Sequence, residues 1–150
     1  MLRSLTVSLC CAVMACSTLI ALLATSAWCA GPDWVLLDED NDSRFYYDRG
    51  AVKVPSEGVV QVVTRVVYTA EGKADALKIL STVKNFDKLY ESRYRHELNC
   101  GKEESRLLEA SHLDKEGVTL KSTDLASSTE WEEIPPYARL GMVLEKVCPE

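Results

Sequence analysis

The chain has 150 residues, of which 47% are hydrophobic, and its formal net charge at pH 7 is −6. An acidic chain repels phosphate backbones, so this balance argues against nucleic-acid binding, which normally needs a basic surface. The length allows one domain of ordinary size built around a single hydrophobic core.

The N-terminal segment has the layout of a secretory signal peptide. Arg3 gives it a basic start, and residues 5–24 form an uncharged apolar stretch that is closed by small residues. These small residues favour cleavage after Ala27, with cleavage after Ala30 as the alternative. We therefore expect a signal peptide at 1–27.

The exported part of the chain is then a single domain at 28–150. It carries 16 Lys and Arg, because Arg3 leaves with the signal, against 23 Asp and Glu, which gives a net charge of −7. A retained membrane anchor is a weaker alternative, since no basic stop-transfer cluster follows the apolar stretch. Lipid modification at Cys16 is weaker still. The expected destination is the periplasm or the outer cell surface.

The cysteines of the exported domain predict one disulfide bond. Three of the six cysteines lie in the signal peptide, and Cys29 lies beside the cleavage site. Whether Cys29 stays in the mature chain depends on the cleavage point. Cys100 and Cys148 remain in the body of the domain, and an oxidising compartment favours a structural bond between them.

The first half of the domain predicts strands. Residues 34–37 are apolar and residues 44–47 are rich in aromatic side chains. The two runs flank a series of turn formers, which indicates a β-hairpin. A further strand is expected at 51–54. Residues 59–69 form the strongest strand, with an apolar even-numbered face and a mixed odd-numbered face, as in a central strand.

The middle of the chain predicts a short helix at 71–86, where apolar residues fall near helical spacing. Residues 90–100 then alternate as in a half-buried strand. Its inward face is expected to end at Cys100. Its outward face, which we interpret as solvated, carries four charged residues: Glu91, Arg93, Arg95 and Glu97.

The last third of the domain predicts a hairpin and a terminal helix. Strands are expected at 104–113 and 118–122, with Gly117 in the turn between them. Pro135-Pro136 can open a helix of about three turns. Its apolar stripe consists of Tyr137, Leu140, Val143, Leu144 and Val147. The expected fold class is α+β, with an antiparallel sheet of about five to six strands, a C-terminal helix and a short mid-chain helix packed on it, and one disulfide.

Two sets of residues could bind a metal ion, but each has a simpler interpretation. Asp38, Asp40 and Asp42 have the spacing that begins a calcium loop, but the glycine and the bidentate glutamate of that loop are missing. A turn exposed to solvent is the simpler interpretation.

Zinc would need both histidines and both remaining thiols, from His96, Cys100, His112 and Cys148. A disulfide is the simpler use of the thiols. The sequence also has no Gly-x-Ser-x-Gly elbow and no glycine-rich phosphate loop, so we expect no catalytic residues, no metal and no cofactor, and hence no enzyme.

A set of short motifs resembles the surface-adhesin protein E family. The motifs are Trp34, the segment Tyr46-Tyr47-Asp48, Cys100 at the end of an alternating strand, the approach to the last helix at 131–135, and Val147-Cys148. The resemblance implies an antiparallel sheet packed on helices and an exported protein. In its best-known member it implies a lipoprotein, a homodimer and a surface adhesin for laminin, vitronectin and plasminogen.

The combined hypothesis is an exported, non-enzymatic protein-binding module that contacts a protein partner of the extracellular matrix or the envelope through a face of its sheet. The candidate contact residues are aromatic and arginine side chains, which interfaces favour: Phe45, Tyr46, Tyr47, Arg93 and Arg95. The alternative is a periplasmic structural or accessory subunit of an envelope or secretion assembly.

Overall fold

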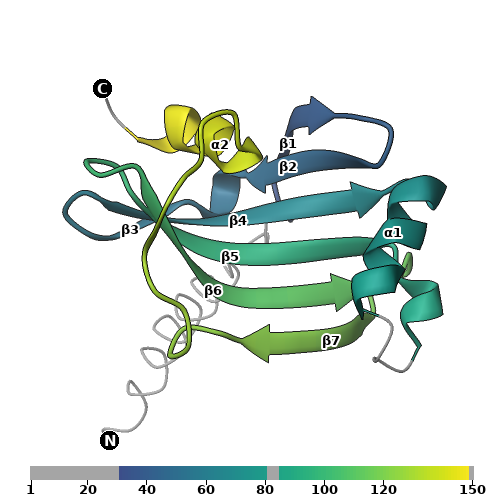
Figure 1. The fold of residues 1–150 in the computed structure, drawn as a ribbon. Coiled ribbons are helices and arrows are strands. Elements are labelled where there is room, and N and C mark those ends of the chain that lie inside the picture. The colour runs from purple at the N-terminus through teal and green to yellow at the C-terminus, as the bar shows by residue number, and fades with distance from the viewer. Residues whose placement is uncertain (1–30, 81–84, 149–150) are drawn as a thin grey trace, which may run out of the picture. The chain divides into compact units, whose positions relative to one another are not determined.

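The computed structural model describes residues 31–80 and 85–148 (Figure 1). The predicted signal peptide, its cleavage site and Cys29 lie outside the described residues. Residues Pro32–Glu150 form a unit of their own, separate from Met1–Gly31. Within the described ranges no helix combines the length and the apolarity that crossing a bilayer requires.

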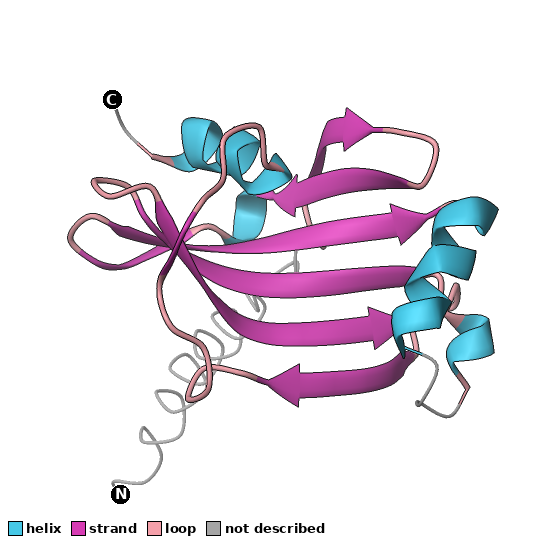
Figure 2. Cartoon of the chain, in the orientation of Figure 1, coloured by secondary structure: helices cyan, strands magenta, loops and turns pink. Residues whose placement is uncertain are grey.

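An antiparallel sheet dominates the domain (Figure 2). Its main path runs in the order β1-β2-β4-β5-β6-β7, while β3 pairs with β4 and β8 pairs with β6. The strands are β1 (Trp34–Glu39), β2 (Ser43–Asp48), β3 (Lys53–Ser56), β4 (Val59–Tyr68), β5 (Glu91–Asn99), β6 (Glu104–Leu113), β7 (Thr119–Asp124) and β8 (Glu132–Glu133). The expected α+β class with an antiparallel sheet is therefore confirmed, although the sheet has eight strands.

Two α-helices accompany the sheet. Helix α1 (Ala70–Leu80) follows β4, and helix α2 (Arg139–Val147) ends the described chain. Two 3-10 turns, η1 (Arg49–Ala51) and η2 (Phe86–Lys88), complete the elements. The expected helix at 71–86 is too long, because Phe86 already belongs to η2 and residues 81–84 lie outside the described part.

The start of the C-terminal helix also differs from the prediction. Helix α2 begins at Arg139 rather than at the proline pair, because Tyr137 takes a left-handed φ of 67° and Ala138 is extended. The Tyr137 side chain is fully exposed, so it does not belong to the apolar stripe. Leu140, Leu144 and Val147 do pack against the core, as expected.

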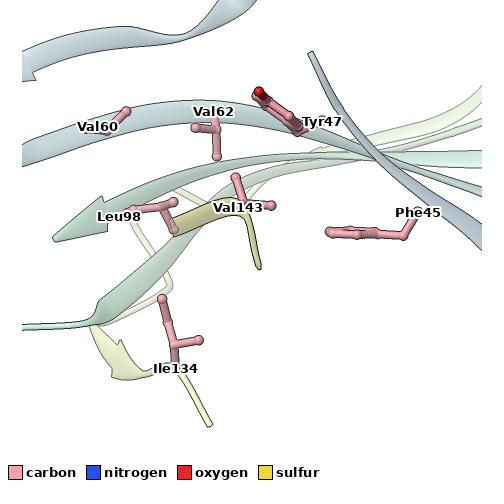
Figure 3. Packing of buried hydrophobic residues seen from close by; sticks show 7 residues of the cluster. All are labelled: Phe45, Tyr47, Val60, Val62, Leu98, Ile134 and Val143. Atoms are coloured by element: carbon pink, nitrogen blue, oxygen red, sulfur yellow. The ribbon is translucent and has the colours of Figure 1, made fainter. Parts of the chain in front are cut away.

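The two faces of the central strands differ as the alternation predicted. On β4, Val60, Val62 and Thr64 are buried, and they pair across β5 with Leu98, His96 and Tyr94. Helix α2 adds Val143, which has no exposed surface, to this side of the sheet. Figure 3 shows Val143 among the side chains of the strands. The buried cluster consists of Phe45, Tyr47, Val60, Val62, Leu98, Ile134 and Val143.

Two further links hold α2 on the sheet. Cys100 and Cys148 form a disulfide with a Cα–Cα distance of 5.6 Å, which confirms the predicted bond between strand and helix. At the other end of α2, Arg139 donates to Asp38 at 2.7 Å and to Asp40 at 2.7 Å. The helix is therefore fixed at both ends.

The acidic turn between β1 and β2 has a structural role. Asp40 accepts the backbone N–H groups of Asp42 and Ser43, each at 2.8 Å. These hydrogen bonds, together with nearby Arg139, lower the pKa of Asp40. The Asp38 and Asp40 carboxylates are thus engaged by an arginine and by the turn backbone, as in the interpretation preferred over calcium.

Candidate binding face

The sheet has a second face, opposite to the one that α2 covers, and we call it the open face. The register of β2, β4 and β5 places Tyr46 beside Arg65 and Arg65 beside Arg93. Trp34 stands next to them on β1. Among the described residues, α2 and η2 pack on the other side of the sheet. Val143 of α2 joins the buried cluster there, and Phe86 of η2 contacts His112.

A buried carboxylate lies at the centre of the charges on the open face. Glu91 is only 3% exposed and accepts from two guanidinium groups. Arg65 donates through Nε at 2.6 Å, with a second contact through Nη2, and Arg93 donates through Nε at 2.7 Å. Such charge-assisted hydrogen bonds are among the strongest that side chains make.

The expectation that Glu91, Arg93, Arg95 and Glu97 form a solvated stripe is therefore wrong for Glu91. Arg65 and Arg93 lie directly opposite each other on neighbouring strands, and like charges in such a pair repel. A carboxylate placed between them removes this repulsion. The pairing of β4 with β5 thus explains why Glu91 is buried.

Aromatic rings cover the same arginines. The ring centroid of Trp34 lies 5.4 Å from Cζ of Arg65 and 5.5 Å from Cζ of Arg93. The ring of Tyr46 lies 5.6 Å from Cζ of Arg65. Both rings are within the range of cation–π attraction, which holds the guanidinium groups in place. The result is a packed cluster of aromatic and arginine side chains, the two kinds that interfaces use most.

A hollow opens beside this cluster. It has a volume of about 220 Å³, and its lining includes Arg93, Arg95, Glu109 and Val63. Arg95 pairs with Glu109 on the neighbouring strand at 2.8 Å, and Arg95 remains 41% exposed. The hollow therefore combines an apolar wall with partly exposed charges.

A second aromatic–arginine pair lies farther along β6. Arg106 donates to Glu97 on β5 at 2.6 Å, and its Cζ lies 5.3 Å from the ring centroid of Trp131. Glu97 therefore also belongs to an ion pair rather than to a freely solvated stripe. Its side chain is 15% exposed.

The five candidate contact residues divide between the two faces. Tyr46, Arg93 and Arg95 lie together on the open face. Phe45 and Tyr47 are 5% and 6% exposed and belong to the core. Because side chains alternate along β2, a run of three aromatic residues must point to both sides of the sheet. Phe45 and Tyr47 therefore offer no surface to a partner.

Sequence reasoning missed three members of the cluster. The sequence predicts strands at Trp34 and Arg65 but no role for either side chain in binding, and it predicts that Glu91 faces solvent. The alternation of β4 and β5 gave the parity of Arg65 and Arg93 correctly. The register between the strands, which brings all three residues together, is not encoded in any short motif.

The covered face holds a polar chain beneath η2. Ser92 on β5 has no exposed surface, and its Oγ lies 2.7 Å from Nδ1 of His112 and 2.9 Å from the hydroxyl of Tyr68. Burial lowers the pKa of His112, and the charge of Lys121 lowers it further. A serine beside a histidine could act as a nucleophile, but Oγ of Ser92 is closed to any substrate.

The zinc alternative finds no support in the geometry. Cys100 and Cys148 are joined to each other, and the described residues contain no cluster of three or more side chains suited to a metal ion. Burial lowers the pKa of His96 to about 4, so its imidazole is neutral at physiological pH.

Residues 34–149 match the family described as Surface-adhesin protein E. The chain belongs to the surface-adhesin protein E family. The match begins at Trp34, so it includes the open face, the covered face and the disulfide. No curated protein matches the chain.

A solved structure shows the same fold. The structure of Haemophilus influenzae protein E matches with a TM-score of 0.52 at 15% identity, over 77% of this chain and 83% of that one. At this identity the likeness concerns the fold alone. Family membership and fold together identify the chain as an adhesin-like surface protein.

Proposed function

We propose that the chain is an exported, non-enzymatic binding module of the cell surface that holds a protein partner against the open face of its sheet. Membership of the surface-adhesin protein E family supports a binding role. The observation that carries the choice of face is the cluster of Trp34, Tyr46, Arg65 and Arg93 around the buried carboxylate of Glu91.

Physical properties of the cluster support this assignment. Interface hot spots are enriched in Trp, Tyr and Arg, and they bind best when their conformations are fixed beforehand. The carboxylate of Glu91 binds the guanidinium groups of Arg65 and Arg93. The rings of Trp34 and Tyr46 pack against the same groups. The partner therefore meets side chains that lose little conformational freedom on binding.

The test measures capture on immobilised vitronectin, laminin and plasminogen, the ligands that the family resemblance implies. We expect the double variant Tyr46→Ala, Arg95→Gln to lose capture, because both side chains face outward and neither belongs to the core. Ile79→Ala is the matched control, since Ile79 is 84% exposed and belongs to helix α1 rather than to a strand of the sheet. Arg93 is left out of the double variant, because its removal would also take away one of the two partners of the Glu91 carboxylate.

Thermal unfolding of each variant is recorded alongside. The proposal fails if the double variant captures these proteins as well as the unchanged chain does. It also fails if the unchanged chain captures none of these proteins. In that case, cross-linking on intact cells that traps only subunits of an envelope assembly would support the alternative, an accessory subunit.

A further inference from the structure

Strands β4, β5 and β6 carry four arginines on the open face, and three of them lie against a tryptophan ring. The ring centroid of Trp34 is 5.4 Å from Cζ of Arg65 and 5.5 Å from Cζ of Arg93. The ring centroid of Trp131 is 5.3 Å from Cζ of Arg106. Packing of a guanidinium group against an aromatic ring is therefore a repeated feature of this face.

The fourth arginine, Arg95, is the exception. Among the described residues no aromatic ring lies over its guanidinium group, and 41% of its side chain is exposed. Its orientation is nevertheless fixed, because Nη2 pairs with Glu109 at 2.8 Å. Glu109 in turn accepts hydrogen bonds from the hydroxyl groups of Ser111 and Ser122. The open face thus presents one oriented arginine that lacks the ring its neighbours have.

The hollow lies beside this arginine and is large enough for one ring. Its lining includes Arg95, Val63 and Leu113, and Val63 pairs directly with Arg95 across β4 and β5. A protein cavity of roughly 150 Å³ can hold a benzene ring, whereas pockets for drug-sized ligands measure roughly 300 to 1,000 Å³. The volume of about 220 Å³ therefore suits a single side chain that carries a ring.

The charges around the hollow balance. Asp124 on β7 lies directly opposite Glu109, so three carboxylates accompany three guanidinium groups. These groups belong to Glu91, Glu109, Asp124, Arg65, Arg93 and Arg95. A charged group of a partner would lose its hydration here without gaining a free counter-charge, which is costly. The balance therefore favours an uncharged occupant.

From this balance, and from the rings over the neighbouring arginines, we infer that the hollow receives an aromatic side chain of the partner protein. That ring lies against the guanidinium group of Arg95. The inference rests on the proposed binding function and adds the chemistry of the partner's contact residue. The apolar side chains of Val63 and Leu113 suit the carbon atoms of a ring, and the guanidinium group suits its π-electrons.

The test uses the purified exported protein and two blocked tripeptides, acetyl-Gly-Phe-Gly-amide and its counterpart with cyclohexylalanine in place of phenylalanine. The saturated ring is similar in size and more apolar but has no π-electrons, so the pair separates attraction to a cation from burial of apolar surface. Binding is followed by nuclear magnetic resonance at the methyl signals of Val63. We expect the phenylalanine peptide to shift these signals saturably and to bind roughly two- to fivefold more tightly than the cyclohexylalanine peptide.

Variants locate the effect at Arg95. Arg95→Gln is expected to remove the preference for the aromatic ring, because the amide carries no charge. Arg44→Gln is the matched control and should keep the preference. Arg44 also lies on a strand and pairs with a glutamate, Glu39, but it does not line the hollow.

A second variant, Thr119→Phe, decides the question if Arg95→Gln unfolds. Thr119 lines the hollow and is exposed, so the new ring comes from the chain itself and competes for the same space. We expect Thr119→Phe to abolish binding of the phenylalanine peptide.

The inference is overturned if the phenylalanine peptide shows no saturable binding, or if it binds no more tightly than its saturated counterpart. An unchanged preference in Arg95→Gln, or unchanged binding in Thr119→Phe, also overturns it. These outcomes are distinct from failure of the proposed function. Capture of a host protein that depends on Tyr46, without any preference for the aromatic ring, refutes the inference alone. A preference that depends on Arg95, without capture of any protein, refutes the proposed function alone.

Discussion

Glu91 shows how one side chain sets the properties of a whole surface. A carboxylate that is 3% exposed is stable only when it is paired, and here two arginines pair with it. The same contacts orient both guanidinium groups beneath Trp34. A residue that resembles part of a solvated stripe in the sequence is thus the anchor of the candidate site.

The substitution Glu91→Gln tests this role. It removes the charge but keeps the shape, so Arg65 and Arg93 are left facing each other without compensation. Breaking a buried ion pair costs about 3 to 5 kcal/mol, but these arginines are 22% and 36% exposed and partly screened by water. We therefore expect the free energy of unfolding, measured by urea denaturation, to fall by about 1 to 3 kcal/mol.

Glu39→Gln is the control for this change. Glu39 pairs with Arg44 in the same way, but both side chains are about half exposed. Its free energy of unfolding should change by less than about 1 kcal/mol. Equal effects of the two substitutions would show that the burial of Glu91 has no energetic significance.

At the scale of the elements, alternation and turn signals predicted most of the fold. Strand β6 has the bounds that the sequence indicated, and Gly117 has the positive φ of 81° that its turn position requires. The start of α2 could not be predicted, because it depends on the left-handed conformation of Tyr137, which no local preference favours.

The candidate site was predictable only in part for a similar reason. Parity along β5 placed Arg93 and Arg95 on one face, and parity along β2 separates Tyr46 from its two aromatic neighbours. Which residue of β1 or β4 stands beside Arg93 depends on strand order and register. These are properties of the assembled sheet, and no segment encodes them alone.

Two helical glycines give a matched test at this scale. In α1, a Cβ on Gly72 would overlap the backbone carbonyl of Asp42 in the β1–β2 turn. Thr69 ties the same turn to the helix through its hydroxyl, at 3.0 Å from the Asp42 carbonyl. In α2, a Cβ on Gly141 would meet nothing within 4 Å.

The same substitution, glycine to alanine, should therefore change the free energy of unfolding in opposite directions at the two sites. Gly72→Ala forces the turn away from the helix and should lower the free energy of unfolding by about 1 to 3 kcal/mol. Gly141→Ala should raise it by about 0.5 to 1 kcal/mol, because alanine favours the helix. Thermal denaturation of both variants measures the difference, and a gain at Gly72 would contradict the close contact with the turn.

At the scale of the whole domain, one covalent bond joins distant parts of the chain. Cys100 and Cys148 are 48 residues apart in the sequence. Closing a loop of this length restricts the unfolded chain and stabilises the fold by about 4 kcal/mol on the chain-entropy relation. That is a large share of the roughly 5 to 15 kcal/mol by which domains are stable.

Replacing both cysteines by serine should therefore lower the free energy of unfolding by about 4 kcal/mol in denaturant titrations. The unchanged protein in a reducing agent should approach the same value, which controls for the serine side chains. A double variant as stable as the oxidised protein would contradict a structural role for the bond.

Helix α2 is attached at both of its ends and lies on one side of the sheet only. Each strand therefore has one face that holds the core together and another that faces outward. Residues on the covered face and residues on the open face can diversify separately, since the first set maintains the core and the second faces outward. Apart from Glu91 and its two partners, Arg65 and Arg93, the exposed positions of the outward set are the ones to vary in a display library. Such a library would let the domain be retargeted to new ligands.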